Sequence, residues 1–573
     1  MFLKKLLVYM KGYIKECILG PLFKLLEALF ELFVPLVVAA IIDKGIAAGD
    51  TPYIVKMCLV LVLLGFAGLA FSITAQYFAA KASVSFVARL RHVLFEHIQK
   101  LSYSELDELG TSTMVTRMTS DMNQVQNGVN LTLRLLLRSP FVVFGAMVMA
   151  FTINAQAAMI FVYVTVLLLI VVFAIMLCSI PLYRKVQQKL DGVTSVTREN
   201  LTGVRVIRAF CKEGEETERF VSRNSELTHS QEFVGRISAL MNPVTYIIIN
   251  LGIIFLINRG AINVEQGIIT QGAVVALYNY MSQILVELIK LANLIINITK
   301  SIACGNRIQA ALETEPSVTD GKGGSEKGEY AAEFRHAFIK YRNAGDYALS
   351  DIDFTVNKGE TVGIIGGTGS GKSSLVNLIP RFYDVCGGNV LVNGVDVKDM
   401  AVSELRDKIG VVPQKAMLFK GTIRENLLWG NENASDADIE EAVKAAQALD
   451  VIKAKGGYDC EIEQGGKNLS GGQRQRLTIA RALVRKPEIL ILDDSASALD
   501  FATDAALRKS LRELDYSPAV FIVSQRTSSI LHADKIIVLD DGKAVGIGTH
   551  AELLENCEVY KEIYNSQFKK EAV

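Results

Sequence analysis

One short segment of the chain has the residue types and spacing of a phosphate-binding loop. Residues 366–373 read Gly-Gly-Thr-Gly-Ser-Gly-Lys-Ser, which fits the pattern Gly-x4-Gly-Lys-Ser. Glycines let the backbone approach phosphate oxygens, and the N-terminus of a following helix adds partial positive charge. Lys372 would reach the β- and γ-phosphates, and Ser373 would ligate Mg2+. A glycine-rich turn without a ligand is the alternative, but the pattern favours a nucleoside triphosphate site. The residues predicted to bind the phosphates are Gly366, Thr368, Gly369, Ser370, Gly371, Lys372, Ser373 and Ser374.

The elements that must position this loop are predicted on both sides of it. The run 361–365 is strand-like, and the run 374–379 can open a helix. A second apolar run, 488–492, is rich in β-branched residues and predicts a buried parallel strand. Asp493 ends that run, and a carboxylate at the end of such a strand can hold Mg2+ beside the phosphate loop. An acidic residue that caps a strand is otherwise ordinary, so this role depends on the loop.

A second helix start lies between the phosphate loop and that strand. Its residues are Leu469, Ser470, Gly471, Gly472 and Gln473. The backbone N–H groups, the Ser470 hydroxyl and the helix dipole can all face a phosphate. If this helix start and the phosphate loop both lie on the surface of one domain, they cannot contact the same nucleotide within that domain. We therefore expect two domains face to face, each presenting its Ser470 or the equivalent residue to the other's nucleotide.

Composition points to a membrane protein with several units. The chain has 573 residues, too many for one core, and its 60 basic and 60 acidic residues argue against a nucleic-acid partner. The eight cysteines are scattered, so neither a zinc site nor a disulfide framework is predicted. Six apolar runs reach the roughly 20 residues that cross a bilayer. They lie near 18–41, 54–79, 133–155, 157–181, 238–258 and 272–296. The alternative is that the six runs are buried helices of a soluble protein, but such a protein would need a core large enough to bury all six.

The connections between the runs predict orientation and domain boundaries. The connections after the second and fourth runs are long and basic, and basic loops of membrane proteins lie mostly in the cytoplasm. We therefore expect these connections, both termini and the nucleotide domain to be cytoplasmic, and the spans to lie in the cell membrane. Residues 314–333 are polar and glycine-rich, which is typical of a linker. The predicted fold is therefore an all-α transmembrane domain of six helices (1–313), a linker (314–333) and an α/β phosphate-loop domain (334–573).

Ionisable residues inside the predicted spans have two interpretations. Such groups are costly in lipid and are therefore functional candidates. Glu27 and Glu31 lie four apart in the first span, and Glu287 and Lys290 lie three apart in the sixth. They could line an aqueous cavity that accepts amphiphilic cations. The alternative, which we favour slightly, is local pairing of Lys24 with Glu27 and of Glu287 with Lys290 near the cytoplasmic ends, outside the lipid.

The motif at 469–473 resembles the signature of ATP-binding cassette proteins, and six spans before such a domain resemble the half-transporters of the exporter type. The resemblance covers essentially the whole chain, and 113–121 and 199–210 are similar to the two cytoplasmic coupling segments. It implies ATP and Mg2+ as ligands and an ATPase coupled to transport across the lipid bilayer. Tyr341 matches the aromatic that stacks on adenine, with Tyr347 as a second choice. Gln414 matches a glutamine that senses Mg2+ and touches the membrane domain, and Asp500 matches a loop that crosses the dimer interface.

Two residues depart from the pattern of that family. Its members place glutamate after the Mg2+ aspartate, as the base that polarises water, whereas this chain has Asp494. The intrinsic pKa values of the two acids are close, about 3.9 and 4.3, so reach is what differs. One methylene less withdraws the carboxylate by roughly one C–C bond, and a misplacement of about 1 Å can cost on the order of 100-fold in rate. Gln525 stands where the family has histidine, and an amide donates a hydrogen bond but cannot become a cation.

Both departures beside an intact loop predict a site that binds ATP but hydrolyses it slowly. The intact signature would complete a competent site on a different half-transporter, where most of the ATPase activity would lie. This resembles bacterial heterodimeric multidrug exporters with one degenerate site, and the expected cargo is hydrophobic drugs or lipids. A homodimeric ATP-binding regulator or sensor, or a homodimeric lipid or peptide exporter, remains the alternative.

Overall fold

The computed structural model describes residues 6–321, 323, 328–342 and 344–568. Contacts divide the chain into two compact units. A membrane unit contains Met1–His97 and Ser112–Glu313, and a C-terminal unit contains Ile98–Thr111 and Thr314–Val573. Of the predicted linker, residues 322 and 324–327 lie outside the described ranges.

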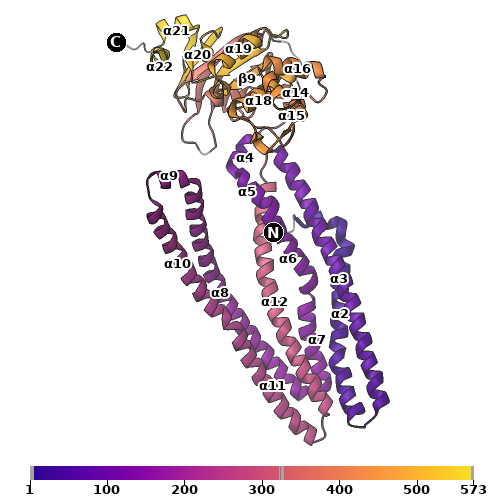
Figure 1. Ribbon diagram of the computed structural model, residues 1–573. Coiled ribbons are helices and arrows are strands. Elements are labelled where there is room, and N and C mark those ends of the chain that lie inside the picture. Colours follow the sequence, from indigo (N-terminus) through magenta and orange to yellow (C-terminus); the bar gives the residue numbers. More distant parts are fainter. Residues whose placement is uncertain (1–5, 322, 324–327, 343, 569–573) are drawn as a thin grey trace. The chain divides into compact units, whose positions relative to one another are not determined.

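The membrane unit is helical and has the six predicted spans. Helical segments long and apolar enough to cross a membrane are Val8–Ile46, Thr51–Lys100, Thr111–Ile153, Ala155–Thr202, Glu213–Glu265 and Gln271–Leu312 (Figure 1). Helix α8, at 48 residues, is about 70 Å long, more than twice the roughly 30 Å of a hydrocarbon core. The spans therefore extend far beyond the bilayer. Their main helices are α2 (Ile14–Ala40), α3 (Thr51–Lys100), α6 (Met122–Leu135), α7 (Arg138–Ile153), α8 (Ala155–Thr202), α10 (Glu213–Ala239), α11 (Met241–Glu265) and α12 (Gln271–Leu312).

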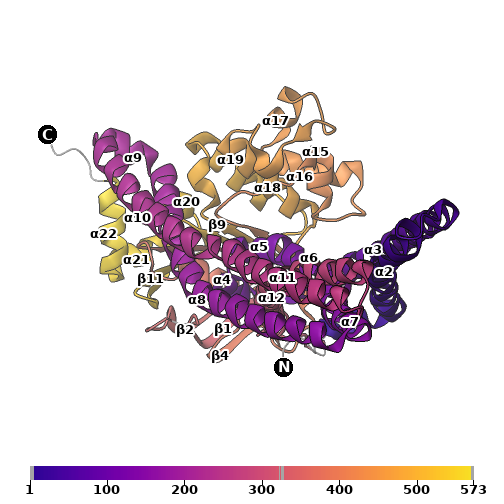
Figure 2. The same cartoon turned by 90° about the horizontal axis from the view of Figure 1, so that it is seen from below.

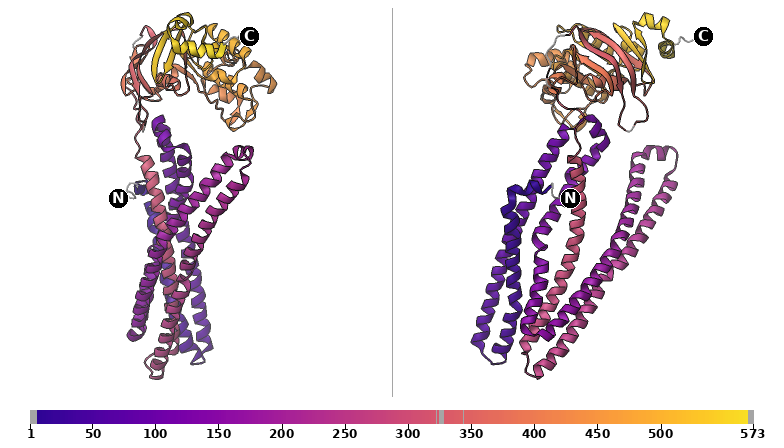
Figure 3. Two further views of the ribbon diagram at one scale, coloured as in Figure 1. Left: turned by 90° about the vertical axis from the view of Figure 1, so that its left-hand side faces the viewer. Right: turned by 180° about the vertical axis from the view of Figure 1, so that it is seen from behind.

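Helix α12 is the packing centre of the membrane unit, with contacts to α2, α6, α7, α8 and α11. Small and apolar side chains such as Ala28, Ala146 and Leu277 fill this core and let the helices approach closely. Helices α2 and α3 lie side by side (Figure 2), with the rings of Phe30 and Phe71 stacked at 5.5 Å. Helices α8 and α10 form a long hairpin whose tip is the short helix α9, Val204–Ala209 (Figure 3).

The described part of the C-terminal unit has two large sheets and a two-stranded sheet of β7 (Gly421–Thr422) and β8 (Glu461–Ile462). The larger has six strands in the order β12-β11-β3-β10-β9-β6, and the smaller is antiparallel in the order β2-β1-β4-β5. The strands of the larger sheet are β3 (Thr361–Gly366), β6 (Ile409–Val412), β9 (Ile489–Asp493), β10 (Ala519–Val523), β11 (Lys535–Asp540) and β12 (Lys543–Gly548). Those of the smaller sheet are β1 (Tyr330–Ile339), β2 (Leu349–Asn357), β4 (Gly387–Val392) and β5 (Val395–Asp396). The helices used below are α13 (Lys372–Leu378), α18 (Gly471–Val484), α19 (Phe501–Arg512), α20 (Thr527–Ile530) and α22 (Glu558–Phe568).

Strand register brings the predicted chemistry to one edge of the larger sheet. Strand β10 lies between β3 and β9 and is parallel to both, and Val523 pairs with Ile364 on one side and Asp493 on the other. The carboxyl ends of the three strands therefore meet at the edge where the phosphate loop begins. The predicted order of strand, loop and helix around residues 366–373 is confirmed by β3 and α13.

Candidate functional site

The phosphate loop needs glycine at the points where it turns most sharply. Gly369 and Gly371 have φ values of +85° and +95°, a region that side chains strongly disfavour. A Cβ on Gly371 would lie 2.7 Å from the carbonyl oxygen of Ala348, and one on Gly366 would lie 2.1 Å from that of Leu539. The spacing of glycines thus follows from backbone geometry in the loop, and it leaves the amide groups of the loop bare of side chains.

Lys372 is held inside the loop. Its Nζ donates to the carbonyl oxygens of Gly366 and Gly367 at 2.9 and 2.6 Å. Burial lowers the pKa of this ammonium, while the charges of Asp494 and Asp493 act in the opposite direction. A partly desolvated cation beside the backbone N–H groups of the loop suits a polyphosphate chain, whose negative charge would replace the lost hydration.

Two oxygen ligands suited to Mg2+ lie next to each other. Ser373 Oγ donates to Asp493 Oδ1 at 3.0 Å. Burial raises the pKa of Asp493, and the charge of Asp494 adds to this effect. Mg2+ prefers oxygen ligands and uses one or two protein side chains with water and phosphate oxygens, so this pair fits the ion. Gln414 lies next to this pair, because its Nε2 donates to Oδ2 of the adjacent residue Asp494 at 3.3 Å.

Asp494 follows β9 in an unusual backbone conformation. Its φ is +48°, which aspartate tolerates better than most residues. Its N–H donates to the carbonyl oxygen of Val523 at 3.0 Å, and its own carbonyl accepts from Ser497 Oγ at 2.8 Å. Gln525 lies two residues after β10 with an exposed side chain. Both departures from the family pattern therefore lie at the sheet edge that carries the loop.

The signature segment opens α18 and presents an exposed surface. Ser470 is the N-cap, with its Oγ accepting from the Gln473 N–H at 3.3 Å and its N–H donating to Gln473 Oε1 at 3.0 Å. A Cβ on Gly472 would lie 3.0 Å from the carbonyl oxygen of Ala498, so this segment packs against the residues that precede Asp500. Asp500 caps α19 and accepts from the Thr503 N–H at 2.8 Å, which lowers its pKa. Among the described residues, no hydrogen bond or ion pair joins residues 469–473 to the phosphate loop of the same chain.

Tyr341 contacts the helix that follows the phosphate loop. Its hydroxyl donates to Ser374 Oγ at 2.8 Å, and burial raises its pKa. Its ring meets that of Tyr383 edge-on at 5.1 Å. Tyr347, the second candidate, is exposed and packs edge-on against Phe338 at 5.8 Å. Of the two, only Tyr341 has a hydrogen bond to the loop helix.

One segment between the second and third spans belongs to the C-terminal unit, and this was not predicted from the sequence. This is helix α4, Tyr103–Leu109, within Ile98–Thr111. Tyr103 packs on Phe382 with ring centroids 4.6 Å apart, and Tyr383 donates its hydroxyl to Asp107 Oδ2 at 2.7 Å. Residues 113–121, predicted as a coupling segment, belong to the membrane unit, and their coupling role stays a prediction. A capping box at the start of α4, Ser102 with Glu105, was the available signal.

The predicted local ion pairs in the spans are present, but they belong to a larger cluster. Lys24 lies 2.5 Å from Glu27, and Lys290 lies 2.8 Å from Glu287. Arg138, which was not predicted to take part, contacts Glu287 at 2.5 Å and Glu31 at 2.6 Å. The cluster therefore ties α2, α7 and α12 together by ion pairs.

The three bridged residues lie at a common depth. At about 1.5 Å per residue, Glu31, Arg138 and Glu287 are each about 22–24 Å from the ends of their segments at Ile46, Ile153 and Gln271. The contacts among these charges offset part of the cost of burying them.

Comparisons with known proteins agree with this geometry. Residues 17–288 match the family of the ABC transporter transmembrane region, and residues 349–497 match the ABC transporter family. The chain is 36% identical, over 99% of each length, to the uncharacterized ABC transporter ATP-binding protein YfiB of Bacillus subtilis. It is 32% identical to an ATP-dependent lipid A-core flippase of Syntrophus aciditrophicus, over 85% of this chain and 81% of that protein.

A solved structure is similar in fold. It is a bacterial Atm1-family ABC exporter with ATP bound, with a TM-score of 0.82, 24% identity, and coverage of 98% of this chain and 100% of that one. The six membrane helices and the C-terminal phosphate-loop unit are both covered by this match. The chain therefore belongs to the ABC transporters, with a six-helix membrane domain that precedes an ATP-binding cassette domain in the fold of that exporter.

Proposed function

We propose that this chain is one subunit of a heterodimeric ATP-driven exporter. Its own site would bind ATP and Mg2+ and hydrolyse slowly, while its signature segment completes a competent site on the partner half-transporter. The observation that carries the proposal is the pair Asp494 and Gln525 at the edge of an otherwise intact phosphate site. Asp494 is too short for the usual base, and Gln525 supplies no positive charge to the γ-phosphate.

The residues of this site have separate tasks in the proposed cycle. Lys372 and the loop N–H groups hold the phosphates, Tyr341 supports the adenine, and Ser373, Asp493 and Gln414 orient the ion. Mg2+, when bound, neutralises phosphate charge. Because the Gln414 amide contacts Asp494, the short carboxylate is also restrained away from a free position over the phosphates. Such a site favours retention of ATP over its hydrolysis.

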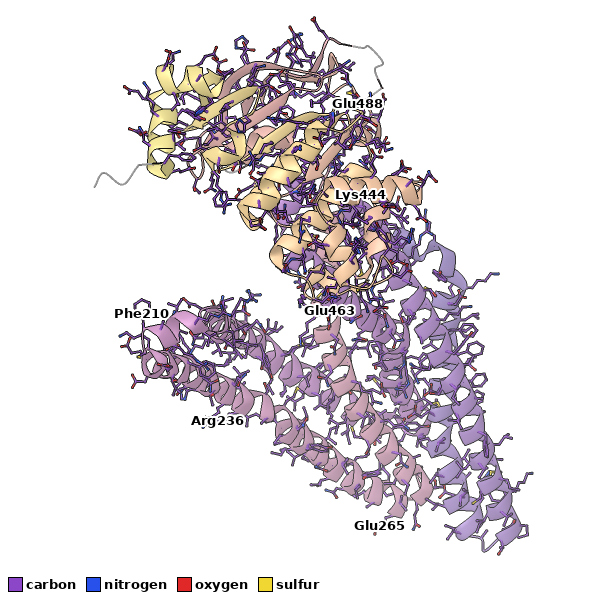
Figure 4. The ribbon with its side chains drawn as sticks, turned by 45° about the horizontal axis from the view of Figure 1, so that its top comes forward. Phe210, Arg236, Glu265, Lys444, Glu463 and Glu488 are labelled. Atoms are coloured by element: carbon purple, nitrogen blue, oxygen red, sulfur yellow. The ribbon has the colours of Figure 1, made fainter. Side chains whose placement is uncertain are left out.

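A partner is further supported by apolar side chains that are exposed on each unit taken by itself. Phe210 follows α9 and is 72% exposed, and Leu201 before α9 is 73% exposed. Figure 4 shows Phe210 at one end of the α10–α11 rod and Glu265 at the other. In the C-terminal unit, Phe419 and Trp429 stack at 4.2 Å and are both exposed. Exposed aromatic groups of this kind are typical of protein interfaces.

The proposed cycle uses ATP binding to move the spans. Two ATP molecules would close the nucleotide domains, and closure would switch the spans from inward- to outward-facing. Hydrolysis at the partner's site would reset them. Both termini and the nucleotide domain would lie in the cytoplasm, as the basic loops indicate. The cargo would be a hydrophobic drug or a lipid, and similarity to a protein named as a lipid A-core flippase supports a lipid-like molecule.

The experiment uses the asymmetry of the two sites. A tagged chain is purified with its partner, which mass spectrometry identifies, and ATPase activity is compared for Ser470→Arg and Lys372→Ala in the complex. Ser470→Arg should reduce activity by about 100-fold because it removes donors from the competent site. Lys372→Ala should reduce it only severalfold because it disables the slow site. Equal losses would contradict the proposal, as would full activity of the chain without a partner. Glu432→Ala, at an exposed position of the same unit, is the control.

A further inference from the structure

The last described helix holds the loop that carries Gln525. Gln567 of α22 accepts through Oε1 from the Thr527 N–H at 2.8 Å and from Thr527 Oγ1 at 2.9 Å. Its Nε2 donates to the backbone carbonyl oxygen of Gln525 at 2.7 Å. One side-chain amide thus makes three hydrogen bonds to residues 525–527, here called the switch loop. Donor and acceptor are both used, which fixes the direction in which the amide faces.

Helix α22 is firmly attached to the domain core. Tyr560 is fully buried in the core, and its hydroxyl lies 2.8 Å from Nδ1 of His550. The His550 ring also packs on Tyr564, with ring centroids 5.3 Å apart. Gln567 stands two helical turns after Tyr560, so the anchored helix fixes the point from which its amide reaches the loop.

The switch loop is also restrained from its other side. The Arg526 N–H donates to Ser524 Oγ at 2.9 Å. The guanidinium of Arg526 lies over the ring of Phe501, 5.3 Å from its centroid. Phe501 directly follows Asp500 and is 69% exposed. The switch loop is therefore held between the segment at Asp500 and the helix at Gln567.

We propose that Gln567 is a positioning residue that holds the switch loop in place and thereby slows the release of nucleotide from this chain's site. The proposal rests on the function proposed above, in which this site retains ATP. The carbonyl of Gln525 is fixed by Gln567, so the Gln525 side chain starts from a set position at the edge that carries the phosphate loop. Without Gln567 the backbone of 525–527 gains freedom, and the amide donor of Gln525 spends less time near a phosphate.

Hydrogen exchange tests the restraint without any nucleotide. In the purified complex, Gln567→Ala should make the Thr527 amide exchange roughly tenfold faster, because two hydrogen bonds to Thr527 are lost. Gln567→Glu keeps an acceptor for Thr527 and removes the donor to Gln525, so Thr527 should exchange nearly as in the unmodified chain. Asn565→Ala, at an exposed position of the same helix, should leave the exchange rate of the Thr527 amide unchanged. Unchanged exchange in Gln567→Ala would overturn the proposal.

Nucleotide dissociation then tests the consequence. With a fluorescent ATP analogue, both Gln567→Ala and Gln567→Glu should release nucleotide from this site about five- to tenfold faster, with Asn565→Ala unchanged. Faster release in Gln567→Ala alone would mean that the Gln525 contact is not used, and the positioning role would be wrong. A complex that retains no nucleotide at this site would refute the proposed function itself, and it would do so before any change at Gln567 is made.

Discussion

Restoring the two missing catalytic groups should convert the slow site into a hydrolysing one. The change is Asp494→Glu with Gln525→His. Glutamate extends the carboxylate by about 1.5 Å, the length of one C–C bond. Since a misplacement of about 1 Å costs on the order of 100-fold, this extension should recover a similar factor. Histidine can become a cation beside the γ-phosphate and should add at least about tenfold.

The structure also sets a cost for this change. Asp494 has a φ of +48°, and glutamate adopts that conformation less readily than aspartate, by about 1 kcal/mol. The longer side chain must also pass the Gln414 amide, which lies 3.3 Å from Asp494 Oδ2. We therefore expect the double variant to hydrolyse about 1,000-fold faster at this site. Its midpoint of thermal unfolding should be lower by about 3 °C.

The assay is steady-state phosphate release by the complex after the partner's catalytic carboxylate has been removed, so that only this chain's site can turn over. Asp494→Asn is the matched control, because it keeps the length of the side chain and removes its charge. Hydrolysis should be unaffected by this control if Asp494 is idle. A loss of tenfold or more in Asp494→Asn would show that the short carboxylate already acts as the base, and the reasoning about reach would be refuted.

Three further predictions concern contacts outside the phosphate site. Arg138→Met should destabilise the membrane unit by about 3 kcal/mol, measured by thermal unfolding in nanodiscs, because Glu287 loses one of its partners. The double variant Arg138→Met with Glu287→Gln should lose less stability than the sum of the two single variants, and strict additivity would contradict the ion pair. Tyr383→Phe removes only the hydrogen bond from the Tyr383 hydroxyl to Asp107, so amide hydrogen exchange in α4 should rise severalfold while the affinity for ATP stays constant. Unchanged exchange would mean that this hydrogen bond is not formed. Burial lowers the pKa of His550, so the unfolded chain binds more protons and the stability of the folded chain should fall as the pH drops from 7.5 through the histidine range. The unfolding midpoint of His550→Gln should vary less over that range. An equal pH dependence in this variant would show that His550 is not the cause.

Much of the architecture and of the phosphate site was predictable because the signals are local. Six apolar runs identify six spans by length, since a bilayer requires about 20 apolar residues whatever surrounds them. The loop at 366–373 is recognisable because its glycines serve the backbone of the same eight residues. Asp493 was predicted to end a buried strand, and it is the last residue of β9.

Other features needed contacts between segments far apart in the chain. The pairing of Glu287 with Lys290 follows from their spacing in one helix, but Arg138 lies in another span, and hydropathy does not indicate which helices face each other. The same is true of α4, where Tyr383 meets Asp107 across a long stretch of sequence.

The amino-acid sequence by itself determined the presence of six spans, a phosphate loop and a signature segment, together with the substitutions at Asp494 and Gln525. These are properties of residue type and short spacing. Tertiary structure alone decided that Gln567 restrains the switch loop, that Arg138 joins three spans and that α4 packs with the C-terminal unit. Side chains distant in sequence meet only where the packing of helices and strands brings their backbones within reach, and no local pattern carries that information.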